Sequence, residues 1–260
     1  MMKWFAKSRI AIGLVAVAVF SACGQADAPQ GGEAGSANDP QSQSMAAPIA
    51  VEFFTSQGCS SCPPADELAA ELISDPDLVI ISRPVTYWDR LGWRDTLGRE
   101  ENSRLQRSYA SRLRYGGGRA YTPQAVVDGR FGLIGSRRGE LRDALDDARE
   151  EQAGIAISIR RLETGGSHVV MIGGGPEAPA IVTLVALDST ETVDIGAGEN
   201  SGRSLTYTNI VVDERLIGHW DGDGVSLVLS EADLATEGAD RHAIVVRQGE
   251  AGPIVAARYL

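Results

Sequence analysis

Between residues 49 and 152, two patterns of apolar and polar residues alternate along the chain. Runs of apolar, β-branched and aromatic residues, typical of buried strands, alternate with segments whose apolar residues recur every three or four positions, as on one face of a helix. We expect strands at 49–55, 78–84 and 124–128 and helices at 65–73, 99–114 and 139–152. Strands that alternate with helices predict an α/β layer structure.

The pattern changes after Gly154, where short strand-like runs follow one another with Gly, Pro, Asp and Asn between them. These runs lie at 155–159, 168–172, 181–187, 204–212, 226–229 and 243–246. Their spacing predicts an all-β sandwich of roughly 100 residues. We therefore expect an α/β domain at 49–153, followed by a C-terminal all-β sandwich-like domain at 154–260.

The chain begins with the pattern of an export signal. Three basic residues precede an apolar run at 10–22, which is shorter than the ~20 residues that a membrane-spanning helix needs. A basic segment followed by a short apolar one is typical of a secretory signal peptide. The run ends in Phe20-Ser21-Ala22-Cys23, which resembles the lipobox of bacterial lipoproteins. We predict a signal peptide at 1–22 and lipidation of Cys23; plain signal cleavage nearby, with Cys23 left as a free thiol, is the alternative.

The segment 23–48 consists mainly of Gly, Ala, Ser, Gln, Asn and Pro. It has almost no apolar side chains to bury, so we expect a flexible linker. Removal of residues 1–22 takes the formal net charge from −11 to −14, because three positive charges and no negative ones are lost. So acidic a protein is a poor candidate for binding nucleic acid or anionic lipid by charge. We expect contact with the membrane only through the lipid on Cys23.

The candidate chemistry lies in Cys59-Ser60-Ser61-Cys62, between a predicted strand and a predicted helix. The first turn of a helix offers unpaired N–H groups and the positive end of the dipole, and both stabilise a thiolate. Cysteines in this position ionise at lower pH than a free thiol, and Pro63 and Pro64 suit the start of a helix. We therefore predict that Cys59 is the exposed nucleophile and Cys62 the resolving thiol of a redox-active pair.

Two other uses of a cysteine pair compete with redox chemistry. A zinc site would need a second pair of ligands, and the three histidines, His168, His219 and His242, all lie in the second predicted domain. A structural disulfide is the stronger alternative, although a bond that closes so short a loop gains little from the entropy of the unfolded chain.

Two further positions are candidates for the same site, because a strand, a C-x-x-C pair and a helix in this order resemble thioredoxin-like folds. Such folds place a cis-proline opposite the cysteines, and Thr122-Pro123 directly precedes a predicted strand. Thioredoxin also has a buried acid that exchanges protons with the resolving cysteine. Glu52 is the candidate for that acid, and an edge or solvent-facing glutamate is the alternative.

Four segments resemble one bacterial secreted family, known as domain of unknown function 1223 (DUF1223). They are 53–66, which contains the cysteines, 87–93, 121–124 and 198–209. The resemblance covers the chain from residue 49 to its end. It implies a thioredoxin-like domain followed by a β-sandwich, and it supplies no activity.

Three smaller features have alternative interpretations. Trp88 and Trp93 could line a substrate groove, but packing in the core is favoured. Polar residues near 200 (Glu199, Asn200 and Arg203) could bind a ligand, but docking of a loop against the first domain is favoured. Asp221-Gly222-Asp223-Gly224 lacks the further acids of a calcium loop, and a hairpin turn explains it.

Two functions from different classes follow. The first is a thiol–disulfide oxidoreductase without a cofactor, which acts on protein thiols or disulfides or on a redox partner protein. It would face the periplasm from a lipid anchor, with the outer membrane favoured because Gly24 stands where an inner-membrane retention signal places Asp. The second is a non-catalytic binding or assembly lipoprotein that keeps the scaffold and a structural disulfide.

Overall fold

The two longest strands of the chain link its two predicted domains. The computed structural model describes residues 47–115, 118–152, 154–163, 166–175 and 179–260. The predicted signal peptide, Cys23 and most of the predicted linker lie outside the described residues. Strands β7 (Ala180–Asp194) and β8 (Ser204–Trp220) form a hairpin. β8 also pairs in parallel with β2 (Leu78–Pro84).

The other elements are shorter. The remaining strands are β1 (Ile49–Thr55), β3 (Gln124–Val127), β4 (Phe131–Ile134), β5 (Ala156–Arg161), β6 (His168–Gly173), β9 (Val225–Leu229), β10 (Arg241–Arg247) and β11 (Ile254–Tyr259). The helices are α1 (Pro63–Leu72), α2 (Glu100–Tyr109), α3 (Arg138–Glu150), α4 (Glu231–Leu234) and the 3-10 helix η1 (Asp89–Leu91). No helix in the described part of the chain is long and apolar enough to cross a membrane.

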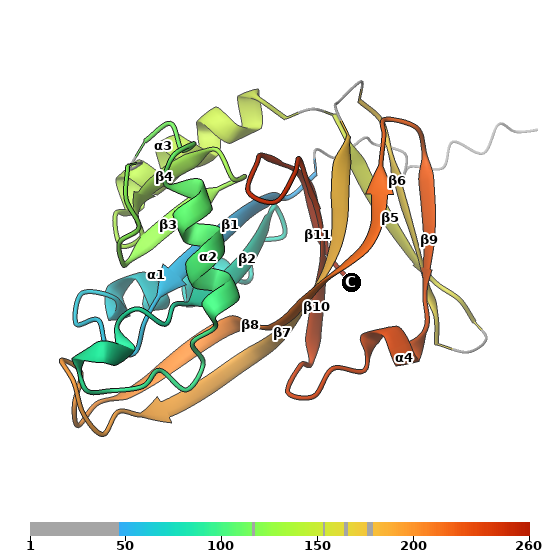
Figure 1. Cartoon of the computed structure of the whole chain (residues 1–260). Helices are drawn as coiled ribbons and strands as arrows, with labels where there is room; N and C mark the ends of the chain where they lie inside the picture. The colour runs from blue at the N-terminus through green and yellow to red at the C-terminus, as the bar shows by residue number, and fades with distance from the viewer. Residues whose placement is uncertain (1–46, 116–117, 153, 164–165, 176–178) are drawn as a thin grey trace, which may run out of the picture. The chain divides into compact units, whose positions relative to one another are not determined.

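Strands from both predicted domains form one eight-stranded sheet, in the order β11-β10-β7-β8-β2-β1-β3-β4. β2 lies parallel to β1 and to β8, and the other neighbours are antiparallel. The predicted thioredoxin-like α/β domain followed by a separate all-β sandwich-like domain is therefore wrong. The chain is mainly β, its mixed sheet runs through the predicted boundary at residue 153 (Figure 1), and residues from Ser44 to Leu260 form one compact unit.

Side-chain hydrogen bonds hold β2 and β8 together, and the apolar pattern of the sequence does not predict them. Asn209 in β8 has a φ of 49°, in the left-handed region that Asn tolerates better than most residues. Its amide donates hydrogen bonds to the Ile80 carbonyl oxygen (3.0 Å) and to the Tyr259 hydroxyl (2.7 Å). These side-chain bonds join β8 and β11 to β2, where the main-chain pairing is limited to Ser82 and Ile210.

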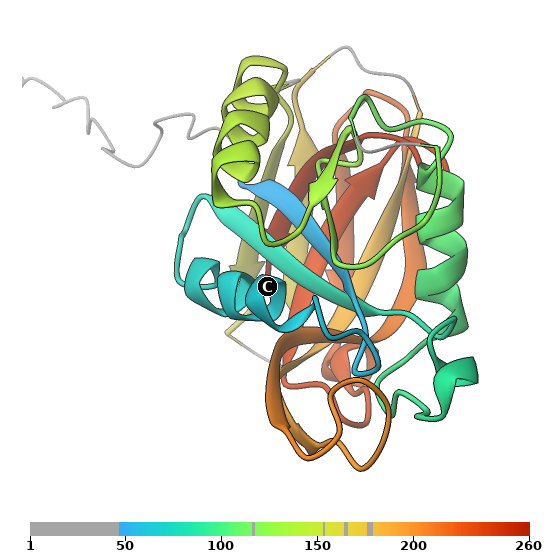
Figure 2. The ribbon, with the colours of Figure 1, turned by 90° about the vertical axis from the view of Figure 1, so that its left-hand side faces the viewer.

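Alternation along β1 sends its side chains to opposite faces of the sheet. Val51 and Phe53 pack with α1 and α3 in one core, whereas Phe54 packs with α2 on the other face. Figure 2 shows α1 and α3 on one side of the blue strand β1 and α2 on the other. A second sheet, β5-β6-β9, lies against the far half of the large sheet, with which it shares a core.

Candidate functional site

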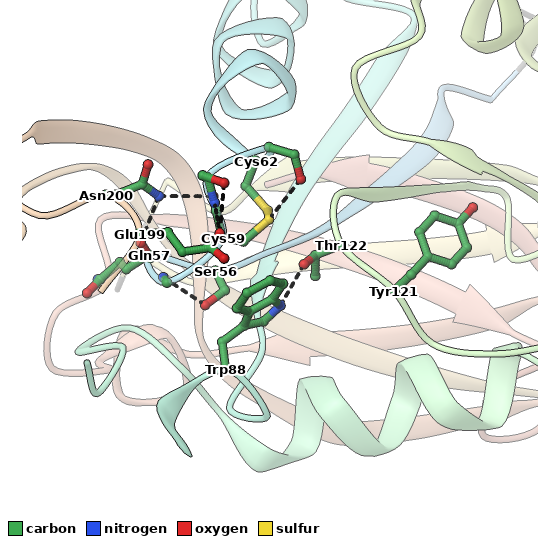
Figure 3. Close-up of a disulfide and its surroundings, with 12 residues drawn as sticks. Ser56, Gln57, Cys59, Cys62, Trp88, Tyr121, Thr122, Glu199 and Asn200 are labelled. Atoms are coloured by element: carbon green, nitrogen blue, oxygen red, sulfur yellow. Dashed lines mark hydrogen bonds between the residues drawn. A yellow bond between two sulfur atoms is a disulfide. The ribbon is translucent and has the colours of Figure 1, made fainter. Parts of the chain in front are cut away.

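The two cysteines are joined in a disulfide in the loop between β1 and α1, with their Cα atoms 5.4 Å apart (Figure 3). Cys62 directly precedes α1. The loop is a series of tight turns, in which the Cys59 N–H donates to the Ser56 carbonyl oxygen and the Cys62 N–H to the Cys59 carbonyl oxygen, each over 3.1 Å. The pair therefore stands at the beginning of a helix.

Both cysteine side chains are completely buried, with exposed fractions of 0%. The prediction of an exposed Cys59 is wrong. Part of the cover comes from Trp88, whose side chain lies 3.2 Å from where a Cβ on Gly58 would stand. Its indole N–H donates to the Thr122 hydroxyl over 2.8 Å. Trp88 thus lies between the cysteine loop and the loop that precedes β3 (Figure 3).

The other cover is the turn between β7 and β8, residues 195–203, which we call the arm loop. A carboxylate oxygen of Glu199 accepts hydrogen bonds from the Ser60 N–H (3.0 Å) and hydroxyl (2.7 Å), and these bonds hold the pKa of Glu199 below its ordinary value. The Asn200 amide donates to the carbonyl oxygens of Gln57 and Cys59, each over 2.9 Å. These contacts confirm the docking interpretation of the segment around residue 200.

Trp93 strengthens the same contact. Its indole N–H donates to the Gln57 side-chain oxygen over 2.8 Å, and its ring lies so close to Gly196 that a Cβ there would stand 2.9 Å from it. The contacts of both tryptophans thus pack them against the cysteine loop, and each remains partly exposed.

Thr122-Pro123 has the predicted cis peptide bond. The proline approaches the beginning of α1 across Gly135, since a Cβ on Gly135 would stand 3.2 Å from the Ala65 side chain and 3.4 Å from the Pro123 ring. A Cβ at this position would be tightly packed, and glycine leaves the most room for this approach. The structure therefore brings Cys59, Cys62, Thr122 and Pro123 into one region.

The first turn of α1 has fewer free N–H groups for the sulfur atoms than the sequence suggested. Pro63 and Pro64 have no N–H, and the N–H groups of Ala65 and Asp66 both donate to the Cys62 carbonyl oxygen, over 2.8 and 3.2 Å. The N–H groups expected to be free in this turn are therefore absent or paired, and the helix dipole remains. The Ser61 hydroxyl oxygen lies 3.3 Å from Cys59 Sγ.

Comparison with known proteins now identifies the chain. The model of the family described as "Protein of unknown function (DUF1223)" matches residues 50–247. The chain belongs to the DUF1223 family. The predicted family is thus confirmed, while the family description supplies no activity.

Two solved structures resemble this DUF1223 chain. The crystal structure of protein AGR_C_4864 from Agrobacterium tumefaciens is 32% identical over 83% of this chain and 95% of that one, with a TM-score of 0.70. HBP35 of Porphyromonas gingivalis is 15% identical over 83% of this chain and 75% of that one, with a TM-score of 0.53, and shows a likeness of fold alone. No curated protein matches the chain.

The DUF1223 site contains a buried acid that the sequence interpretation missed. Asp66, in the first turn of α1, is only 7% exposed, and one of its carboxylate oxygens has no hydrogen-bond partner in the described structure. Burial, with a smaller contribution from the charge of Asp95, raises its pKa to about 8. Helical spacing could have revealed the burial of Asp66. This residue follows Cys62 by four positions and precedes Ala69 by three, which places it on the buried face of α1.

Asp95 holds the DUF1223 cysteine loop from another direction. Its carboxylate accepts hydrogen bonds from the Gln57 N–H (2.8 Å) and from the Leu97 N–H (2.9 Å). Burial raises the pKa of Asp95 against the effect of these bonds. Among the described residues, no three His, Cys, Asp or Glu side chains lie close enough together to hold a metal ion.

Glu52 belongs to a different buried site. It is 0% exposed and its carboxylate binds Arg83 Nε (2.6 Å), Arg247 Nη2 (2.9 Å) and the Tyr109 hydroxyl. Burial raises the pKa of Glu52, but the two guanidinium groups outweigh it and hold the pKa below its ordinary value. The solvent-facing alternative is therefore wrong, and no hydrogen bond or ion pair between described residues joins Glu52 to either cysteine.

Proposed function

We propose that the Cys59–Cys62 pair carries out thiol–disulfide exchange with a protein partner outside the cytoplasm. The observation that carries this proposal is the way the cysteine loop is held. Its N–H groups donate hydrogen bonds to the carboxylates of Asp95 and Glu199, and its carbonyl oxygens accept hydrogen bonds from the Asn200 amide. A disulfide between residues only three positions apart contributes little as a staple. A structural role alone therefore does not account for a loop that distant parts of the chain position so closely.

The exchange consists of two substitutions at sulfur. A thiolate of the partner attacks Cys59 Sγ, the Cys59–Cys62 bond breaks, and its electron pair leaves on Cys62, which takes up a proton. A second partner thiol, after losing its proton, attacks the partner sulfur of the mixed disulfide and releases Cys59 as a thiolate. The partner dithiol loses two electrons and the pair gains them. The same steps in reverse reduce a partner disulfide.

Burial of the pair favours a second candidate function. With both cysteines 0% exposed, a partner sulfur reaches them only if Trp88 or the arm loop moves aside. A protein in which neither moves would keep the disulfide intact and act as a binding or assembly lipoprotein.

Variants that keep only one cysteine of the pair distinguish between these two functions. In a Cys23→Ser background, Cys62→Ser leaves Cys59 as the one thiol, and we expect it to form a mixed disulfide with oxidised glutathione at least about tenfold faster than Cys59→Ser does, because the attacking sulfur is the one retained. Intact-protein mass spectrometry measures both rates. Equal rates, or no adduct on Cys59, would favour the binding lipoprotein.

We also propose that Cys23 anchors the protein by a lipid in the outer membrane. The lipobox-like segment and Gly24 support this location. Wild-type protein should sediment with outer membranes, and Cys23→Ser should not, because the acyl chains have no other attachment point. Fractionation of cells that express each protein tests the anchor, and wild-type protein in the soluble periplasmic fraction would contradict it.

A further inference from the structure

A hollow of about 300 Å³ lies beside the cysteine loop, on the side of Trp88 and Thr122. We call it the arginine groove. Trp88 and Thr122, joined by their hydrogen bond, form the wall nearest the disulfide (Figure 3). The other lining residues used below are Leu91, Tyr121, Arg90 and Arg119.

The two arginines of this groove have no carboxylate partner among the described residues. Some exposed arginines elsewhere are paired with carboxylates, as in Arg104–Glu101, Arg107–Glu100 and Arg138–Glu71, whereas others, such as Arg142, are not paired within the described part of the chain. No hydrogen bond or ion pair joins the side chain of Arg90 or Arg119 to another described residue. In a chain with a formal net charge of −11, two unpaired cations at one groove favour a ligand that brings its own negative charge.

The arginine groove adjoins a second, larger hollow of about 730 Å³, since Arg119 and Tyr121 line both. Apolar side chains of Leu133 and Ile134, from the edge strand β4, line the second hollow. Its far wall is acidic and consists of Glu140, Asp143 and Asp147 on one face of α3. The surface that leads away from the disulfide is thus cationic first, then apolar, then anionic.

We propose that this surface binds an extended segment of the partner protein, with acidic residues next to its reactive cysteine, apolar residues beyond them and basic residues farther away. The inference rests on the proposed exchange at Cys59–Cys62. A small thiol would occupy only the groove nearest the disulfide, whereas charges of opposite sign along two adjoining hollows suit several consecutive residues of a polypeptide. Attraction between these charges would align the partner cysteine with the disulfide.

Serine-containing peptides test binding separately from redox chemistry. The first peptide has a central Ser flanked on both sides by Glu, then by Leu, with Lys at both ends; the second has Glu and Lys exchanged. Their equal composition removes differences in net charge, and their symmetry removes the choice of chain direction. We expect full-length protein to bind the first peptide about tenfold more tightly, as two partly exposed charge pairs would give, and less so at high salt.

Charge reversal in the groove should abolish this preference. Arg119→Glu and Arg90→Glu are each expected to bring the two affinities to within about twofold, whereas Arg142→Glu, which reverses an exposed arginine of α3 that does not line either hollow, should leave the tenfold ratio. Equal affinities in the wild type, no binding of either peptide, or the same loss in Arg142→Glu would each overturn the inference.

Cysteine versions of both peptides separate this inference from the proposed function. If the first peptide binds more tightly but neither cysteine version forms a mixed disulfide, the groove stands and the exchange function fails. If both cysteine versions exchange at the same rate and bind equally, the function stands and the inference fails.

Discussion

Replacement of Glu52 by glutamine should lower the free energy of unfolding by about 3–5 kcal/mol, because it leaves buried guanidinium groups without their counter-charge. Arg83 keeps a second carboxylate, since its Nη1 lies 2.8 Å from Glu214. Arg247 has Glu52 as its only carboxylate partner among the described residues. Both arginines are at most 2% exposed, so water cannot replace the lost interaction.

Denaturant unfolding at neutral pH measures this change. Glu71→Gln is the matched control, because Glu71 also pairs with an arginine, Arg138, but on the surface. Exposed ion pairs contribute little to stability, so the control should unfold close to the wild type. A Glu52→Gln protein as stable as the Glu71→Gln protein would show that the buried network does not hold the sheet together.

The stability of the protein should fall as pH rises from 5 to 8, and Asp66 should be the largest single cause. Burial raises the pKa of Asp66 from 3.8 to about 8, so the folded protein keeps a proton that the unfolded chain releases near pH 4. Between these values the unfolded state binds fewer protons, and each pH unit lowers the free energy of unfolding by about 1.36 kcal/mol. The stabilising effect is present below pH 4 and is lost as pH approaches 8, on the order of 4 kcal/mol between pH 5 and 8.

Asp66→Asn removes the titrating group and should flatten the pH dependence of stability. A smaller slope should remain up to pH 7, because burial also raises the pKa of Asp128 to about 7. Glu67→Gln, which changes the exposed neighbour of Asp66 on α1, is the control. It removes only the smallest contribution to the raised pKa of Asp66 and should keep nearly the wild-type slope. Unfolding curves at four or five pH values measure the effect, and an Asp66→Asn protein with the full wild-type slope would contradict the assignment.

Local features of the chain were predictable because neighbouring residues determine them. The strand at 78–84 has the predicted limits, and the cysteine pair stands between a strand and a helix as the apolar run before it and the prolines after it indicate. The hairpin of β7 and β8 was predicted as two shorter strands. Its outer part, Asp188–Asp194 in β7, is largely exposed and has no apolar alternation that could mark it as strand.

Features that depend on distant residues were not predictable from periodicity. Glu52 lies among apolar residues, and its partners Arg83 and Arg247 stand 31 and 195 positions away. The sheet that crosses residue 153 depends on the side chain of Asn209. The burial of the cysteines depends on the arm loop, about 140 positions along the chain. In each case polar side chains from far along the sequence take part in the structure.

The reduction potential of the Cys59–Cys62 pair in the full-length protein tests the central proposal most directly. The protein is equilibrated in thiol buffers of graded potential, and the fraction of reduced pair is read by alkylation and mass spectrometry. Exchange with protein partners predicts half-reduction between about −120 and −270 mV, where known thiol–disulfide oxidoreductases lie. A pair that stays oxidised to below about −300 mV, as structural disulfides do, would contradict the proposal.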